Sequence, residues 1–291
     1  MTEVLRYAAF TSDPAGGNPA GIVLEADGLD EARMQEIAAD VGYSETAFVL
    51  RAGRQTSDYG LRFFSPLAEV AFCGHAMIAT SVALAESGAG GPFRFDTKAG
   101  EIEVSTRRDS DGIRASLRSV PAHSRPANTE SLRDALRALR WSPDDLDPRY
   151  PPHVAYAGND HLVLAARSRR RLSDLHYDFT ALKELSDREV WTTLQLFWPE
   201  SDSVFHSRNP FPVGGVVEDP ATGAAAAALG AYLRQIGRLP PRSSFTVIQG
   251  EDMGRPSRLG VTVNATNPGI TVSGTAVPIP PSQQAAPTRA S

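Results

Sequence analysis

The feature that most constrains the fold is a run of very small residues, Ala224 to Ala228, behind the stretch Glu218-Asp219-Pro220-Ala221-Thr222-Gly223. A proline just inside a helix start wastes no backbone donor, and Asp219 can accept from the free N–H groups of the first turn. We therefore predict a helix from this point to about Gly237, because a glycine suits a helix end. A helix that is apolar on every side is a buried helix, so other backbone must pack closely around it.

A second stretch has the same construction. Cys73-Gly74-His75-Ala76 opens another small-residue segment, which ends at Gly88; when Gly74 is aligned with Gly223, Gly88 falls on Gly237. Shared spacing of this kind is typical of an internal duplication. We therefore predict two related halves, each built around one central helix. The free N–H groups and the dipole at a helix start also attract anions, so both helix starts are candidate anion sites.

Length and net charge limit the classes of protein to which the chain can belong. The chain has 291 residues and a formal net charge of −5, with its charges dispersed. The sequence has no long basic run of the kind that would predict a nucleic-acid partner. It also has no apolar run as long as a membrane span. The first residues lack the pattern of a signal peptide, so we expect a cytoplasmic protein. With one cysteine we expect neither an intrachain disulfide nor a cysteine-based zinc site, and the histidine spacing predicts no metal.

The remaining pattern predicts strands gathered around the two helices. Tyr59, Leu61 and Phe63 alternate with polar residues as a half-buried strand should. Because strands do not alternate regularly with helices along the chain, we predict an α+β fold with mostly antiparallel sheets. The polar, proline-rich stretch 121–129 suggests a domain boundary.

The predicted elements are as follows. Helices are expected at 30–40, 74–88, 130–139, 177–185 and 220–237. Strands are expected at 4–10, 20–24, 44–49, 59–63, 93–97, 101–106, 112–117, 154–157, 161–165, 190–197, 203–207, 245–249, 259–264 and 270–274.

Five stretches carry a family resemblance. They are Gly17-Asn18-Pro19-Ala20-Gly21, Ser44-Glu45-Thr46-Ala47-Phe48, Glu69-Val70-Ala71-Phe72-Cys73-Gly74-His75-Ala76, Glu218-Asp219-Pro220-Ala221-Thr222-Gly223, and Gln249-Gly250 with Met253-Gly254-Arg255-Pro256-Ser257. In this order, over about residues 7 to 275, they resemble the successive signatures of the PhzF-like phenazine biosynthesis isomerases. The family is similar in fold to diaminopimelate epimerase.

The resemblance implies two pseudo-symmetric domains, each a strongly bent, mostly antiparallel sheet wrapped round a central helix, with the active site in the cleft between them. It also implies that the last strand can return to the first domain. We therefore expect an N-terminal half at 1–120, completed by a strand at about 268–277, a C-terminal half at 121–267, and a mobile tail at 278–291.

The resemblance also implies roles for single residues. Glu45 is expected to be the acid/base that takes a proton from one substrate carbon and returns one to another. A carboxyl group that is partly desolvated in a cleft can have its pKa raised toward the working range. His75 is expected to be a hydrogen-bond partner or relay, and Asp219 to contact the polar groups of the substrate. Judged without the family, the same three residues would be a turn residue, a first-turn histidine and an N-cap.

Four further residues are expected to contact substrate. Gly74 and Gly223 would let backbone N–H groups approach a carboxylate. Ala224 stands where many family members have serine, so it would offer only its N–H group. Asn18 would order the turn that lines the cleft, although a purely structural role is at least as good an interpretation. Met77 also departs from the family, since threonine is usual there, and both departures bear on the identity of the substrate.

The expected function is a cofactor-independent proton shift in a small carboxylated metabolite, cyclic and unsaturated, with Glu45 as the shuttle. No phosphate loop, nicotinamide fingerprint or flavin motif is present in the sequence, and no cofactor is expected. Diaminopimelate epimerase uses two cysteines, which one cysteine per subunit excludes here. The alternatives are an amino- or hydroxy-acid epimerase with Glu45 and Asp219 as opposed bases, and a catalytically silent ligand-binding protein. The resemblance further implies a homodimer.

Overall fold

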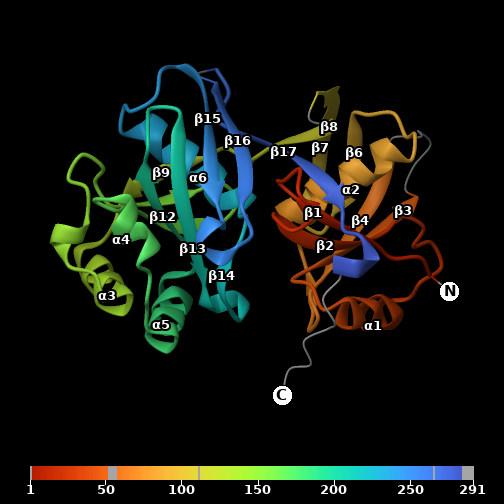
Figure 1. The fold of residues 1–291 in the computed structure, drawn as a ribbon, viewed down its shortest axis with the longest axis horizontal. Helices are drawn as coiled ribbons and strands as arrows, with labels where there is room; N and C mark the ends of the chain where they lie inside the picture. The colour runs from red at the N-terminus through yellow and green to blue at the C-terminus, as the bar shows by residue number, and fades with distance from the viewer. Residues whose placement is uncertain (1, 52–57, 111, 265, 284–291) are drawn as a thin grey trace. The chain divides into compact units, whose positions relative to one another are not determined.

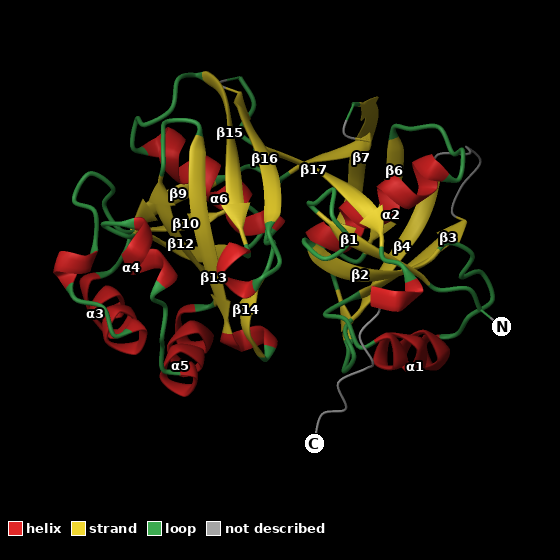
Figure 2. Ribbon diagram, viewed as in Figure 1, coloured by secondary structure: helices red, strands yellow, loops and turns green. Residues whose placement is uncertain are grey.

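The computed structural model describes residues 2–51, 58–110, 112–264 and 266–283. The chain divides into two compact units, the first formed by Met1–Arg118 with Ser273–Ser291 and the second by Ser119–Val272. Both units are built mainly from strands, with fewer helices (Figures 1 and 2). The predicted α+β class is therefore confirmed.

The first unit contains two longer helices and the strands that surround one of them. Its helices are α1 (Glu31–Val41) and α2 (Gly74–Glu86). Its strands are β1 (Leu5–Ala9), β2 (Asn18–Val23), β3 (Thr46–Arg51), β4 (Asp58–Phe64), β5 (Glu69–Val70), β6 (Phe93–Thr97), β7 (Gly100–Asp109), β8 (Gly112–Arg118) and β17 (Thr271–Pro278).

Strand pairing in this unit closes a ring around α2. Antiparallel pairs join β1 to β2, β3 to β4, β6 to β7 and β7 to β8, and parallel pairs join β2 to β3 and β4 to β6. The last strand, β17, pairs with both β1 and β8. The helix inside packs against β1, β2, β3, β7 and β8. Residues 75–84 of α2 are all buried, as its lack of a polar face predicted.

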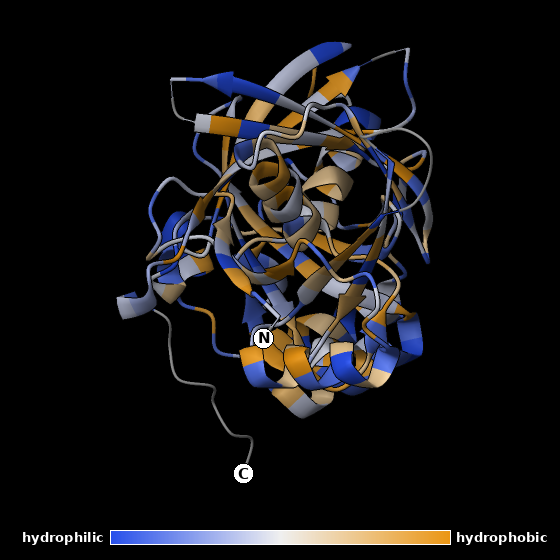
Figure 3. Cartoon of the chain, turned by 90° about the vertical axis from the view of Figure 1, so that its right-hand side faces the viewer, coloured by the Kyte–Doolittle hydropathy of each residue, from blue (hydrophilic) through white to orange (hydrophobic). Residues whose placement is uncertain are grey.

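The other helix of the first unit lies on the outside of the sheet. Asp30 caps α1 by accepting from the Arg33 N–H at 2.8 Å, and Gly42 ends it in the left-handed conformation, at φ 70°. Its buried side, which includes Met34 and Ile37, packs against β3 and β4. Figure 3 shows the resulting mixture of hydrophobic and hydrophilic residues along the outer helices.

The second unit also combines helices with strands. Its helices are α3 (Thr129–Leu139), α4 (Arg169–Ser173), α5 (Phe179–Glu189) and α6 (Gly223–Gln235). Its strands are β9 (His123–Pro126), β10 (His153–Tyr156), β11 (Asp160–Ala165), β12 (Trp191–Pro199), β13 (Val204–Phe211), β14 (Val216–Asp219), β15 (Arg242–Gln249) and β16 (Ser257–Asn264). Short 3-10 turns lie at Pro143–Asp145, Pro212–Gly214, Glu251–Met253 and, in the first unit, Pro281–Gln283.

Pairing in the second unit runs β9, β10, β11, β12, β13, β15, β16, with β11–β12 and β13–β15 parallel and the other pairs antiparallel. The short β14 pairs with β13, as β5 pairs with β4 in the first unit. The buried helix α6 packs against β9, β10, β11, β12 and β16. A leucine-rich core on α3, α5, β11 and β12 supports the other side of the sheet.

The predicted start of the second central helix was wrong. We predicted Asp219 as its N-cap, but α6 begins at Gly223 and its N-cap is Thr222. Asp219 is instead the last residue of β14 and pairs with Asn209. Asp219 is held in β14 by this pairing, and the Gln249 side chain binds the Asp219 carbonyl and the Thr222 N–H, so the helix begins only after Thr222.

The predicted boundary stretch 121–129 begins just after the division between the two units, which follows Arg118, and it contains β9, which pairs with β10 inside the second unit. The prediction about the end of the chain needs correction. The predicted mobile tail begins too early, because Pro278 pairs with Tyr7, and Ile279 is buried and donates its N–H to the Arg6 carbonyl at 2.8 Å. Residues 284–291 of the predicted tail lie outside the described residues.

Candidate active site

A cluster of chemically active side chains surrounds the N-terminal end of α2. Glu45 lies immediately before β3, Cys73 is the N-cap of α2, and His75 is the second residue of the helix. The His75 Nε2 atom lies 3.4 Å from Glu45 Oε2, and Cys73 Sγ lies 3.3 Å from His75 Nδ1. The first unit therefore brings a carboxylate, an imidazole and a thiol together.

The hydrogen bonds of His75 indicate which ring nitrogen carries its proton. The Asn18 side-chain nitrogen lies 3.2 Å from Nδ1, and an amide NH₂ group can only donate. With the Asn18 amide in this orientation Nδ1 accepts, and in the matching neutral tautomer the proton lies on Nε2, which faces Glu45 and also the Ser44 hydroxyl, 3.4 Å away. The imidazole can thus donate a hydrogen bond toward the Glu45 carboxylate.

Burial differs between the members of the cluster. The Glu45 side chain is 17% exposed, whereas that of His75 is 7% exposed and Cys73 is buried. Asn18, the first residue of β2, is also buried. The Glu45 carboxylate is therefore the group of this cluster that a molecule from solvent meets first, with the imidazole behind it.

The start of α2 adds a second attraction for anions. The Cys73 side chain does not cap the helix, and the first turn carries no acidic residue. A Cβ atom placed on Gly74 would meet only the Phe72 ring, at 3.8 Å, which is ordinary contact. The packing of the chain therefore does not require a glycine at position 74. Because Gly74 has no side chain, the backbone N–H groups at the start of the helix are approachable.

The second unit holds Asp219 in a network of its own. The Thr222 hydroxyl donates to Asp219 Oδ2 at 2.6 Å. Buried Gln249 accepts from the Thr222 N–H at 3.2 Å and donates to the Asp219 carbonyl at 2.7 Å. This network fixes the junction between β14 and α6, so the Asp219 carboxylate has a defined direction.

The residue after Gln249 must be a glycine for this junction to form. Gly250 has φ 77°, and a Cβ atom there would lie 2.3 Å from the Arg255 carbonyl oxygen and 2.8 Å from that of Pro220. The beginning of α6 resembles that of α2, since Gly223 and Ala224 are its first two residues, Thr222 does not cap it, and no acidic residue lies in its first turn.

The structure thus sorts the seven predicted site residues into two groups. Glu45, His75, Asn18 and Gly74 lie in the first unit, and Asp219, Gly223 and Ala224 lie in the second. Sequence reasoning gave no site role to Ser44, Cys73, Thr222 or Gln249, although all four lie inside or beside the motifs that it singled out.

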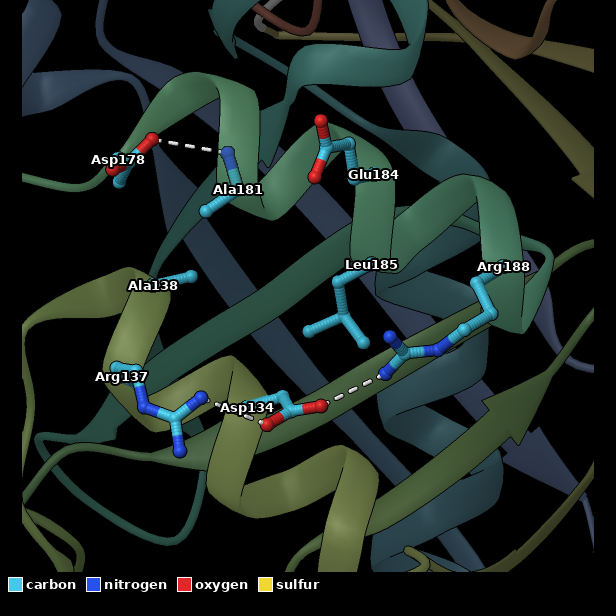
Figure 4. Close-up of a pocket in the computed structure, with 8 residues that line it drawn as sticks. All are labelled: Asp134, Arg137, Ala138, Asp178, Ala181, Glu184, Leu185 and Arg188. Carbon is cyan, nitrogen blue, oxygen red and sulfur yellow. Dashed lines mark hydrogen bonds and ion pairs between the residues drawn. The ribbon is translucent and has the colours of Figure 1, made fainter.

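A surface depression of about 230 Å³ lies elsewhere, between α3 and α5. Figure 4 shows that Asp134 pairs with two arginines of this depression, accepting from Arg137 at 3.2 Å and from Arg188 at 2.9 Å. The Asp178 carboxylate is used as the N-cap of α5. None of the predicted site residues lines this depression.

Within the described ranges, no helix is both long enough and apolar enough to cross a membrane.

Comparison with known proteins gives consistent matches over almost the whole chain. The family model described as phenazine biosynthesis-like protein matches residues 7–280. An uncharacterized isomerase of Bacillus subtilis, YfhB, is 32% identical over 94% of this chain and 96% of its own length. The trans-2,3-dihydro-3-hydroxyanthranilate isomerase of Pseudomonas fluorescens is 33% identical over 86% of each chain.

Solved structures extend the comparison to the fold. A phenazine biosynthesis protein of the PhzF family from Bacillus anthracis superposes with a TM-score of 0.85 and 27% identity, covering 96% of this chain and 98% of its own. A hydroxyproline epimerase from Agrobacterium vitis shares the fold at a TM-score of 0.61 and 14% identity, covering 97% and 94%. The family prediction is thus confirmed, and the chain belongs to the phenazine biosynthesis-like, or PhzF, family of isomerases.

Proposed function

We propose that the chain catalyses a cofactor-independent proton shift in a small, carboxylated, cyclic and unsaturated metabolite, with Glu45 as the acid/base. The observation that carries this proposal is the position of the Glu45 carboxylate. It is partly exposed, it lies 3.4 Å from the Nε2 atom of a buried histidine, and it stands at the start of a helix with no acidic residue in its first turn.

The reaction needs only one proton. The Glu45 carboxylate takes a proton from a substrate carbon next to a conjugated system, and the electron pair left behind spreads over that system. The resulting carboxylic acid then gives the proton to a second carbon, so that a double bond has moved and nothing has been oxidised or reduced. His75 donates from Nε2 to the ionised form of Glu45 and thereby orients it.

Negative charge on the intermediate needs a stabilising partner. The N–H groups near Gly74 can bind the substrate carboxylate, and the helix dipole favours the added charge. In this proposal Asp219 contacts the polar groups of the substrate, while Gly223 and Ala224 offer further N–H donors. Asn18 acts through His75, because it holds the imidazole in the tautomer that faces Glu45.

We also infer that the two units are related halves of one duplicated sequence. Both central helices begin at the aligned glycine and have 13 residues. A glutamate stands five residues before each helix and is paired with an arginine: Arg62 Nε donates to Glu69 at 2.7 Å, and Arg208 Nε donates to Glu218 at 3.0 Å. In both units the arginine lies on the strand that pairs with the glutamate's own strand.

A second candidate is an amino- or hydroxy-acid epimerase, with Glu45 and Asp219 as opposed bases. Its support is the fold, which the chain shares with a hydroxyproline epimerase and with a probable proline racemase at 14% identity each. The two candidates differ in product, because an epimerase inverts one carbon and leaves every double bond in place.

The test is an assay with trans-2,3-dihydro-3-hydroxyanthranilate, the substrate in the name of the Pseudomonas relatives. The reaction should be run in deuterated water without added metal or cofactor and followed by NMR. We expect a shifted double bond, with deuterium at the new C–H position to the extent that the Glu45 proton exchanges with solvent. Inversion of one carbon without bond migration, in this compound or in a panel of proline-like amino acids, would instead support the epimerase.

A further inference from the structure

We propose that Glu45, Cys73 and His75 form a binding site for Zn²⁺, and that the bound ion inhibits the isomerase. Binding at this site is independent of the proposed function. Inhibition rests on the proposed role of Glu45, because a carboxylate that binds a metal ion cannot accept a proton from carbon.

The positions of the three donor atoms fit one small ion. One donor atom from each residue lies within 4.8 Å of the other two. His75 Nε2 is 3.4 Å from Glu45 Oε2 and 3.8 Å from Cys73 Sγ. Tetrahedral zinc, with bonds of about 2.3 Å to sulfur and about 2.0–2.1 Å to nitrogen and oxygen, separates its ligand atoms by roughly 3.3–3.6 Å. The imidazole and carboxylate atoms already have about this separation. The sulfur, which lies 3.3 Å from Nδ1 and 3.8 Å from Nε2, must rotate about the Cys73 Cα–Cβ bond to reach an ion on Nε2.

The kinds of donor favour zinc over the common hard cations. Mg²⁺ and Ca²⁺ prefer oxygen ligands, whereas a thiolate with an imidazole suits Zn²⁺. Three protein ligands leave a fourth position for water. The partly exposed Glu45 carboxylate gives the ion a route from solvent.

The second nitrogen of His75 already has the partner that a metal-bound histidine needs. Zinc on Nε2 moves the ring proton to Nδ1, which then donates to a neighbouring acceptor. Asn18 lies 3.2 Å from Nδ1, and a rotation of its amide would present oxygen in place of nitrogen. Asn18 thus serves His75 in both states, as a donor without the ion and as an acceptor with it.

Spacing along the sequence gave no sign of this site. Cys73 and His75 are two residues apart, but the third ligand comes from a different segment, at the entry to β3. The fold brings them together because α2 packs against β3. The histidine count and the single cysteine, taken alone, predicted no metal site.

The single cysteine makes the experiment unusually direct. Metal-free protein is titrated with Co²⁺, which replaces Zn²⁺ in such sites and gives a thiolate-to-cobalt charge-transfer band in the near ultraviolet. Because Cys73 is the only cysteine of the chain, this band can come from no other residue. We expect one equivalent to bind with this band, and Zn²⁺ to displace the cobalt and abolish it.

Variants separate this site from adventitious binding. Cys73→Ala and Cys73→Ser should lose the band, and Glu45→Gln should bind at least about tenfold more weakly, since even an outer partner such as Asn18 is worth about 10–100-fold. His206→Gln is the matched control, because His206 contacts two carboxylates, Glu200 at 2.7 Å and Glu251 at 2.9 Å, in the second unit. It should leave the cobalt spectrum unchanged. Circular dichroism checks that each variant is folded.

Two results would overturn the proposal: folded wild-type protein that shows no thiolate band, or Co²⁺ affinity that is unchanged in Cys73→Ala. The inhibition is tested separately with the turnover assay described above. Zn²⁺ should inhibit wild-type turnover. At least about tenfold more Zn²⁺ should be needed for the same inhibition of Cys73→Ala. If cobalt binds but the protein has no isomerase activity, the metal site is supported and the proposed function is contradicted. If the protein turns over the substrate but does not bind cobalt at this site, the proposed function is supported and the metal site is contradicted.

Discussion

At the scale of single residues, His75 connects the members of the first-unit site. It receives the Asn18 amide on one nitrogen and faces Glu45 and Ser44 with the other. In the proposed reaction it orients Glu45 and stabilises the ionised form of that carboxylate. Cys73 lies on the other side of the ring and has no part in the proton shift that we propose.

Cys73→Ala should therefore keep substantial turnover. The thiol is buried beside the imidazole, and its replacement by a methyl group removes packing atoms without removing the acid/base. Turnover of folded Cys73→Ala protein, compared with wild type under saturating substrate, is the measurement. Complete loss of activity would restore thiol chemistry to the mechanism.

A second prediction concerns His161, which is completely buried on β11 with its Nδ1 atom 2.8 Å from the Thr193 hydroxyl. Burial lowers its pKa from 6.5 to about 4. Between these pH values His161 binds a proton in the unfolded chain but not in the folded chain. The contribution of neutral His161 to the free energy of unfolding is therefore complete above pH 6.5 and is lost as the pH falls through 4. The loss is on the order of 3 kcal/mol.

Urea unfolding of wild type and His161→Gln at pH 7 and at pH 4.5 tests this sign. Wild type should lose more of its free energy of unfolding over that interval than the variant. His176→Gln is the control, since the His176 side chain is 82% exposed. Equal losses in wild type and His161→Gln would show that this histidine does not contribute to the acid sensitivity.

At the scale of elements, the two buried helices share the same construction. Both begin with a glycine, both lack an acidic first turn, and both are surrounded by strands within their own units. Small side chains are needed along them because the sheets approach closely. One example is Gly230, where a Cβ atom would lie 3.0 Å from Ile270.

Gly74→Val should weaken binding of the anionic substrate without abolishing the fold. The added side chain has room within the chain but covers the N–H groups of the first turn. Loss of one charge-assisted hydrogen bond corresponds to about 10–100-fold in affinity. Titration with trans-2,3-dihydro-3-hydroxyanthranilate measures this, and Gly223→Val is the matched variant on α6. Unaltered affinity in both would place the ligand away from these helix starts.

The arginine–glutamate pairs should differ in their importance for stability. Arg208 and Glu218 have side chains that are 12% and 4% exposed, so Glu218→Gln leaves a charge buried, at a cost of about 3–5 kcal/mol. Glu69→Gln, its counterpart, should cost less, because Arg62 is 25% exposed and keeps Glu31 as a partner at 2.8 Å. Urea unfolding of both variants gives the comparison. A larger cost for Glu69→Gln would contradict it.

At the scale of the whole molecule, the sequence predicted the long elements better than the short ones. The central helices and the strongly alternating strands were predicted because periodicity and terminal glycines mark them, as at Gly42 and Gly237. The two-residue β5 and the four-residue β9 and β14 are too short to show a period, so none of them was predicted as a strand.

The candidate site was predicted through the resemblance more than through physical pattern. The sequence motifs predicted Glu45 and His75 as site residues, and in the structure their side chains lie 3.4 Å apart. The contact of Ser44 with His75 depends on the path of the chain between α1 and β3, which no period encodes, and the contact of Cys73 depends on the conformation at the start of α2. The substrate roles of all seven site residues stay predictions, as do the homodimer and the cytoplasmic location.

The central claim is that Glu45 moves the proton, and Glu45→Gln tests it most directly. The amide keeps the shape of the side chain and much of its hydrogen bonding but cannot accept a proton from carbon. With trans-2,3-dihydro-3-hydroxyanthranilate, the variant should bind about as tightly as wild type, and its kcat should fall by a factor on the order of 10² to 10⁴. Glu36→Gln, at an exposed pair with Arg33, is the control and should turn over normally. Turnover of Glu45→Gln near the wild-type rate would contradict the account.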